Sequence, residues 1–131
     1  MNVLLDTHMA LWAITGSKRL SARAREIIAA SENAIHVSAA SLWEIAIKHA
    51  LKRKGTGAMP ISAAQAHAYF VAAGYAMLPI TPQHVAALEA LPSVHADPFD
   101  RMLVAQGASE PLHLLTHDAD LAAYGAHVLV V

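Results

Sequence analysis

Short apolar, β-prone runs alternate along this chain with longer segments that carry apolar residues at helical spacing. The apolar runs lie at residues 1–5, 34–38, 76–80, 112–116 and 128–131. Predicted helices occupy residues 8–14, 22–30, 39–52, 62–73, 82–90 and 100–108, and a further short helix ends at residue 124. Strands that alternate with helices favour a parallel sheet with right-handed crossovers and helices on both faces. We therefore expect an α/β fold with a parallel sheet of about five strands.

The composition predicts a single domain that spans residues 1–131. The chain is 56% hydrophobic and contains no cysteine, which excludes disulfides and thiolate metal sites. Its apolar runs are too short to span a bilayer, and a predicted strand occupies the place of a signal peptide. We expect no membrane segment and a cytoplasmic location.

The net charge of −1 hides an uneven distribution along the chain. Residues 1–54 hold eight of the nine Lys and Arg residues against four acids, whereas residues 55–131 hold six acids and only Arg101. This split suits a phosphate-bearing partner that approaches a metal-loaded acidic site, although uneven decoration of a solvated surface gives the same pattern. The basic cluster at residues 52–54 also has two interpretations, stabilisation of a helix end and contact with a phosphate backbone.

All five Asp residues lie just after a predicted strand or at the start of a predicted helix: Asp6, Asp97, Asp100, Asp118 and Asp120. The carboxyl ends of neighbouring parallel strands meet at one edge, so Asp6 and Asp118 would meet there if their strands are neighbours. Asp100 can point into the same crevice from the start of its helix. For Asp6 the structural alternative is a helix N-cap, a common role for an Asp after a strand.

Glu44 lies on a predicted helix that is apolar nearly all round. A carboxylate on such a helix needs a partner, a metal or contact with a cleft. The alternative is an ion pair with Lys48 one helical turn further on, which is common on exposed helices. On the residues alone, both interpretations stay open.

A cluster of carboxylates has a definite chemical consequence. Three or four carboxylates in one pocket repel each other, and a divalent cation removes that penalty. Oxygen ligands without Cys or closely spaced His favour Mg²⁺, with Mn²⁺ as a substitute, over Zn²⁺. Water activated by such an ion can attack a phosphodiester, so the chemistry indicated is metal-assisted phosphodiester hydrolysis.

Several motifs, in order along nearly the whole chain, resemble the PIN-domain family and more narrowly the VapC toxins of bacterial toxin–antitoxin pairs. They are Leu5-Asp6-Thr7-His8, Ser41-Leu42-Trp43-Glu44-Ile45, the run from His95 to Gln106 that contains Asp97-Pro98-Phe99-Asp100-Arg101, and Leu115-Thr116-His117-Asp118. The resemblance implies a three-layer α/β/α PIN-like fold. It also implies an Mg²⁺-dependent endoribonuclease, the toxin of a type II system, that is restrained by a VapB-like antitoxin protein. By motif position the catalytic and metal-binding acids would be Asp6, Glu44, Asp100 and Asp118.

The same resemblance suggests supporting roles around these acids. Thr7 and Thr116 would donate hydrogen bonds that orient carboxylates or water. Asp97 is expected to cap its helix rather than to reach the metal, and Asp120 to cap the last helix. Arg101 has two interpretations, an ion pair with a local acid and a contact with substrate phosphate. Three histidines are placed near the pocket, and none is expected as a ligand: His8, His95 and His117.

Two other functional classes compete with an RNA-cleaving enzyme. A phosphoaspartyl or phosphatase-type domain would carry Asp-x-Asp after the first strand and a lysine opposite the acids, whereas residues 55–131 contain no lysine. A PIN-fold RNA-binding module without nuclease activity would have no reason to keep four mutually repelling carboxylates. Apolar surface on helices 39–52 and 62–73 favours a homodimer and a higher assembly with the antitoxin.

Overall fold

The computed structural model describes residues 1–51 and 59–131, so the basic cluster at residues 52–54 lies outside the described residues. The strands are β1 (Asn2–Leu5), β2 (Ala34–Ser38), β3 (Ala76–Leu78), β4 (His113–Thr116) and β5 (Val128–Val130). The helices are α1 (Thr7–Thr15), α2 (Ala22–Ala29), α3 (Ala39–Ala50), α4 (Ala63–Ala72), α5 (Pro82–Ala90), α6 (Pro98–Ser109) and the 3₁₀ helix η2 (Ala119–Tyr124). Within the described residues, no helix is long and apolar enough to cross a membrane.

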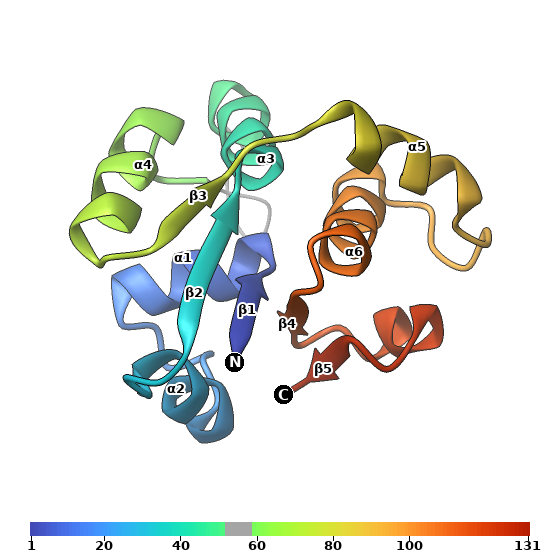
Figure 1. Ribbon diagram of the computed structural model, residues 1–131. Coiled ribbons are helices and arrows are strands. Elements are labelled where there is room, and N and C mark those ends of the chain that lie inside the picture. The colour runs from blue at the N-terminus through green and yellow to red at the C-terminus, as the bar shows by residue number, and fades with distance from the viewer. Residues whose placement is uncertain (52–58) are drawn as a thin grey trace.

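All strand pairs in the sheet are parallel, and the strand order is β3-β2-β1-β4-β5 (Figure 1). In the register, Leu5 of β1 pairs with Val37 of β2 on one side and with Leu115 of β4 on the other. The predicted parallel α/β sheet is therefore confirmed. Because β1 and β4 are neighbours, the residues that follow them emerge side by side at the carboxyl edge.

The sheet separates two apolar cores, which makes the fold three-layered. Val3 and Leu5 point into the core covered by α1, α2 and α4, whereas Leu4 points into the core covered by α6 and η2. All three side chains are fully buried, as alternation on a strand covered on both faces requires. Figure 1 shows the two helical layers on opposite sides of the sheet, with α5 packed outside α6.

Several helices begin just after a residue of a type that commonly serves as an N-cap. Ser21, Ser62 and Thr81 are the N-caps of α2, α4 and α5, and each side chain accepts a hydrogen bond from a backbone N–H of the first turn. Gly16 ends α1 with a φ of 63°, a left-handed conformation that favours glycine.

Three predicted boundaries were wrong. Helix α6 begins at Pro98, before Asp100, because Asp97 is its N-cap. Strand β3 ends at Leu78 and does not reach residue 80, since Pro79 has no N–H to continue the ladder. The last helix, η2, is capped by Asp118 and not by Asp120, whose N–H is the group that Asp118 accepts from.

Candidate metal centre

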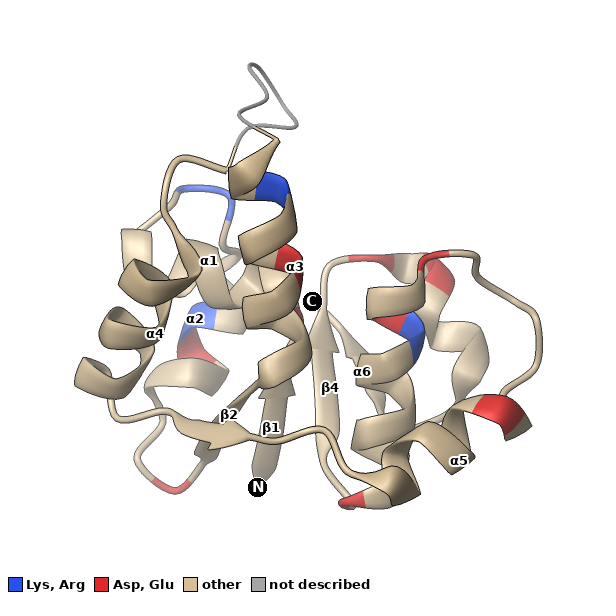
Figure 2. Ribbon diagram, turned by 90° about the horizontal axis from the view of Figure 1, so that it is seen from above, with Lys and Arg blue, Asp and Glu red and all other residues tan. Residues whose placement is uncertain are grey.

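The four acids predicted as ligands line one pocket at the carboxyl edge of the sheet, with a volume of about 390 Å³. They come from four elements: the end of β1, the middle of α3, the first turn of α6 and the start of η2. The pocket is lined by Asp6, His8, Glu44, Lys48, Asp97, Asp100, His117, Asp118 and Ala119. Figure 2 shows acidic segments on both α3 and α6, and a basic segment beside the acidic one on α3.

Asp6 is held in place by hydrogen bonds to both of its carboxylate oxygens. Oδ1 accepts from the Met9 N–H at 2.8 Å and so caps α1, while Oδ2 accepts from Thr116 Oγ1 at 2.5 Å. Asp6 thus has the N-cap role and also lines the pocket. Its side chain is almost fully buried, and burial raises its pKa above the usual 3.8, while the hydrogen bonds from Thr116 and Met9 oppose that rise.

Thr116 connects two of the acids through one hydroxyl group. Its Oγ1 accepts from the Asp118 N–H at 3.0 Å, so its own hydrogen is free to be donated to Asp6. This is the orienting role that was predicted for Thr116. Thr7 has a different partner, because its hydroxyl donates to Ser41 Oγ at 2.9 Å and so ties α1 to α3.

Glu44 both pairs with Lys48 and contacts the pocket, so the two interpretations of its position hold together. It is 3% exposed, and its Oε2 lies 2.6 Å from Lys48 Nζ, so the ion pair of one helical turn is present. Its other oxygen, Oε1, is buried without a hydrogen-bond partner among the described residues. A buried carboxylate oxygen without a partner is costly, which distinguishes this pair from a solvated one on a helix surface.

The pKa of Asp100 shows the effect of the neighbouring carboxylates most clearly. Burial, together with the nearby carboxylates of Asp97, Asp6 and Glu44, raises the pKa of its carboxyl group from 3.8 to about 7, while His95 opposes the rise. The positive groups of the protein therefore neutralise only part of the negative charge of the carboxylates in the pocket.

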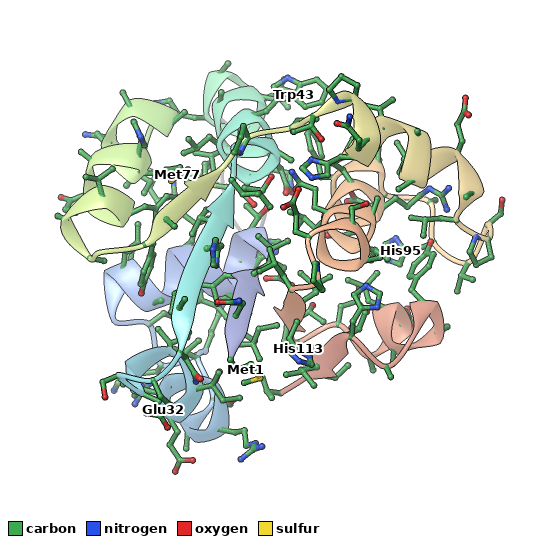
Figure 3. The ribbon with its side chains drawn as sticks, viewed as in Figure 1. Met1, Glu32, Trp43, Met77, His95 and His113 are labelled. Carbon is green, nitrogen blue, oxygen red and sulfur yellow. The ribbon has the colours of Figure 1, made fainter. Side chains whose placement is uncertain are left out.

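His95 lies beside α6 and η2, close to two of the acids (Figure 3). The Asp97 N–H donates to His95 Nδ1 at 3.1 Å, so the neutral ring carries its proton on Nε2. That Nε2 lies 3.3 Å from Asp118 Oδ2 and 3.8 Å from Asp100 Oδ2. In the described part of the chain, His95, Asp100 and Asp118 form a group whose ligand atoms lie within 4.8 Å of one another. The sequence placed His95 near the pocket without predicting this contact, because only the fold of the loop before α6 aims its ring at the acids.

Asp97 occupies the cap position that was expected for it. Its Oδ1 accepts from the backbone N–H groups of Phe99 and Asp100 at 2.8 and 3.2 Å. Asp97 also lines the pocket. The expectation that it does not reach the metal stays a prediction.

Arg101 forms no ion pair with a local acid among the described residues, so that interpretation was wrong, whereas its contact with substrate phosphate stays a prediction. Its guanidinium donates to Pro92 O at 2.9 Å, to Tyr124 Oη at 3.1 Å and to Leu88 O at 3.5 Å. The side chain therefore ties the loop before α6 to η2 and α5, because these carbonyl and hydroxyl oxygens surround it.

Nearly the whole sequence, and not only its acidic motifs, matches a known family. The family described as PIN domain matches residues 3–126 of the chain. The chain belongs to the PIN-domain family. A comparison with curated proteins gave no match.

Solved structures share the fold of this PIN domain along almost its whole length. VapBC2 from Rickettsia felis, bound to a DNA fragment from its promoter, has a TM-score of 0.65 and 14% identity over 100% of this chain and 98% of its own. A toxin–antitoxin complex from Klebsiella pneumoniae has a TM-score of 0.65 and 18% identity, over 98% and 96% of the two chains. Mycobacterium tuberculosis VapC20, a sarcin-ricin loop cleaving toxin, has a TM-score of 0.60 and 19% identity, over 96% and 98%.

The donor set of the PIN-domain pocket fits a hard divalent cation. Carboxylate oxygens from Asp6, Glu44, Asp100 and Asp118 would hold it, and a cation would give the unpartnered Glu44 Oε1 a partner. The same charge would favour the ionised form of Asp100, whose pKa is raised to about 7 without it. Because the neutral ring carries its proton on Nε2, His95 would donate to the carboxylate of Asp118 and would not bind the ion itself.

Proposed function

We propose that this PIN domain is a Mg²⁺-dependent endoribonuclease that acts as the toxin of a type II toxin–antitoxin pair. The observation that supports it most is the buried Oε1 of Glu44, which has no hydrogen-bond partner among the described residues and lies in a pocket with four further acids. A site that only recognised RNA would be expected to present positive charge to the phosphates. Here the walls are mainly acidic, and Lys48 is paired with Glu44.

Each part of the site has a task in this proposal. When bound, Mg²⁺ or Mn²⁺ would activate a water molecule and neutralise charge that develops on the phosphodiester. Asp6, Glu44, Asp100 and Asp118 hold the cation. Thr116 keeps Asp6 and the start of η2 in register through its single hydroxyl group. His95 holds the carboxylate of Asp118 on the side of the pocket that faces Asp100.

The decisive experiment removes one charge from the centre without removing a cap. Asn caps helices as well as Asp does, so Asp6→Asn should fold. Changes next to metal ligands alone typically cost 10- to 100-fold in metal affinity or activity, so losing a ligand should lower RNA cleavage by at least about 100-fold. Asp120→Asn is the matched control, because Asp120 is exposed and does not line the pocket. Undiminished cleavage by Asp6→Asn, or cleavage that persists in EDTA, would rule the proposal out.

The proposed biological role adds an antitoxin as partner. Two of the similar structures are a VapBC2 assembly and a toxin–antitoxin complex, and the third is described as an RNA loop cleaving toxin. An antitoxin could restrain the site by placing a basic side chain among the same carboxylates, which would meet their need for a cation. Induced expression of the chain in a bacterium should arrest growth, and expression of Asp6→Asn should not.

A homodimer is the assembly that the surface supports. Trp43, Ile47 and Leu51 follow one another at one-turn spacing along α3 and are 60%, 40% and 52% exposed. Exposed apolar stripes of this kind mark protein contacts. Light scattering should give a dimer for the chain and a monomer for Ile47→Glu, and a monomeric parent chain would contradict the proposal.

A further inference from the structure

Three aromatic rings gather beside the acidic pocket, and the proposed hydrolysis does not use them. His8 lies two residues after Asp6 and His117 lies one residue before Asp118, so the strand ends that deliver these acids also deliver both imidazoles. Trp12 follows on α1, one helical turn beyond His8. The ring centroids of Trp12 and His117 are 4.8 Å apart. The His8 centroid lies 5.9 Å from that of Trp12 and 6.0 Å from that of His117.

These rings connect the acidic pocket to a second hollow. His8 lines both cavities, while Trp12 lines the hollow and contacts His117 in the acidic pocket. The hollow has a volume of about 200 Å³, and Arg19 forms part of its wall. Pockets for drug-sized ligands begin at roughly 300 Å³. The hollow therefore has the scale of one planar ring and not of a whole nucleotide.

The Trp12 ring is held by the fold, whereas its two neighbours face the solvent. Trp12 is half-buried and packs against the apolar core under α1, α2 and α4. His8 and His117 are both exposed. An aromatic ring that is already fixed in place loses little conformational freedom when a ligand stacks on it, which favours binding.

We infer that Trp12, His8 and His117 form a stacking site for one unpaired base of the RNA substrate, next to the phosphodiester that is cleaved. Arg19 then contacts the neighbouring backbone phosphate. The inference rests on the proposed function, because the acidic pocket defines where the cleaved bond lies. Every base has a π face, so stacking is tolerant of sequence. Stacking does require an unpaired base, because a base inside a duplex has both faces covered. The site therefore selects single-stranded regions.

Substitution of Trp12 tests the stacking site by a change in the protein. Trp12→Leu keeps an apolar contact with the core and removes the ring, whereas Trp12→Phe keeps a ring. We expect Trp12→Leu to raise KM for a single-stranded RNA by about 5- to 150-fold, the range of one stacked base, with little change in kcat. Trp12→Phe should recover most of the loss. An unchanged KM in Trp12→Leu overturns the inference.

A modified substrate tests the same site without changing the protein, in case Trp12→Leu does not fold. After the cleavage position in a single-stranded RNA is mapped, the nucleotides on either side are replaced in turn by abasic ones. One of the two replacements should raise KM of the unchanged protein as strongly as Trp12→Leu does. If Trp12→Leu folds, its KM should be the same for this abasic substrate and for the intact RNA. Equal cleavage of all substrates by the unchanged protein overturns the stacking site.

Fluorescence separates this inference from the proposed function. The chain has two tryptophans, so Trp43→Phe leaves Trp12 as the only one. In EDTA, where no cleavage occurs, a single-stranded oligodeoxynucleotide should quench Trp12 fluorescence, and an abasic strand or a duplex of equal length should not. Cleavage of RNA without quenching overturns the stacking site alone. Quenching without RNA cleavage in Mg²⁺ overturns the proposed nuclease and leaves the stacking site as a nucleic-acid contact.

Discussion

Lys48 Nζ lies 2.6 Å from Glu44 Oε2, inside the pocket that four further acids line. This ammonium group therefore occupies part of the space and satisfies part of the charge that a bound cation would claim. Lys48→Met should tighten Mn²⁺ binding by up to about fivefold, the equivalent of a partly exposed ion pair. Calorimetric titration measures it, with Lys18→Met as a control outside the pocket. Weaker binding in Lys48→Met would show that the lysine supports the metal site instead of competing with the cation.

Thr116 offers a test of how far the site depends on one hydroxyl group. Thr116→Val has nearly the same shape but leaves Asp6 Oδ2 and the Asp118 N–H without their partner. The free energy of unfolding should fall by about 1–3 kcal/mol for a buried group left unpaired, and Mn²⁺ affinity should fall with it. Thr116→Ser keeps the hydroxyl and should lose much less of both. If urea unfolding and metal titration do not distinguish Val from Ser, the hydroxyl has no such role.

The raised pKa of Asp100 makes the stability of the metal-free protein depend on pH. The folded protein keeps a proton on this carboxyl group up to about pH 7, whereas the unfolded chain releases it near 3.8. The folded state thus binds more protons in this window, so the free energy of unfolding falls as the pH rises from about 4 to about 7 and then levels off. Urea unfolding in EDTA across this range measures the slope. Asp100→Asn should flatten it, and an unchanged slope would locate the titrating group elsewhere.

Metal binding should show the opposite trend over the same range. A carboxyl group must lose its proton before it can hold a cation, so Mn²⁺ affinity should rise from pH 5 to about pH 7 and then become steady. Calorimetry in two buffers with different ionisation enthalpies should detect proton release below pH 7. An affinity that does not change with pH would contradict the placement of Asp100 at the metal.

Gln106 ends the sequence motif that contains Asp100, yet it supports the fold and not the pocket. It is fully buried, its Oε1 accepts from Ser38 Oγ at 2.5 Å, and its Nε2 donates to Pro79 O at 3.3 Å. Gln106→Leu should lower the free energy of unfolding by about 1–3 kcal/mol, since it leaves the Ser38 hydroxyl hydrogen and the Pro79 carbonyl unpartnered. Its Mn²⁺ affinity, measured under folding conditions, should equal that of the parent chain. A selective loss of metal affinity would contradict this division.

The positions of the acids could be predicted because the rules of parallel sheets act on the backbone. A residue after a strand must emerge at the carboxyl edge, so Asp6 and Asp118 meet once β1 and β4 are neighbours. A capping residue must stand before its helix, which placed Asp97 correctly at the start of α6. The capping rule needs only nearby residues, whereas the meeting of Asp6 and Asp118 also needs the strand order, which the structure supplies.

These rules do not predict the contacts of long side chains or the conformation of loops. The guanidinium of Arg101 can reach in several directions, and its partners on η2 and before α6 are set by how the loop at residues 91–97 folds. His95 lies in the same loop, and only its final bend brings the ring to Asp118. For Glu44 the sequence offered two alternatives, and the structure contains both because its two carboxylate oxygens have different surroundings.

The order of the strands also sets when the site can form as the chain is synthesised. The hydrogen bond from Thr116 to Asp6 joins residues 110 positions apart, and the space beside β1 stays empty until β4 has emerged from the ribosome. Chains that stop short of residue 113 have Asp6, Glu44 and Asp100 but lack Thr116 and Asp118. Domains fold as units once their distant contacts are available. Under the proposed function, interrupted translation products would therefore lack the complete site and should not cleave RNA in the cell that makes them.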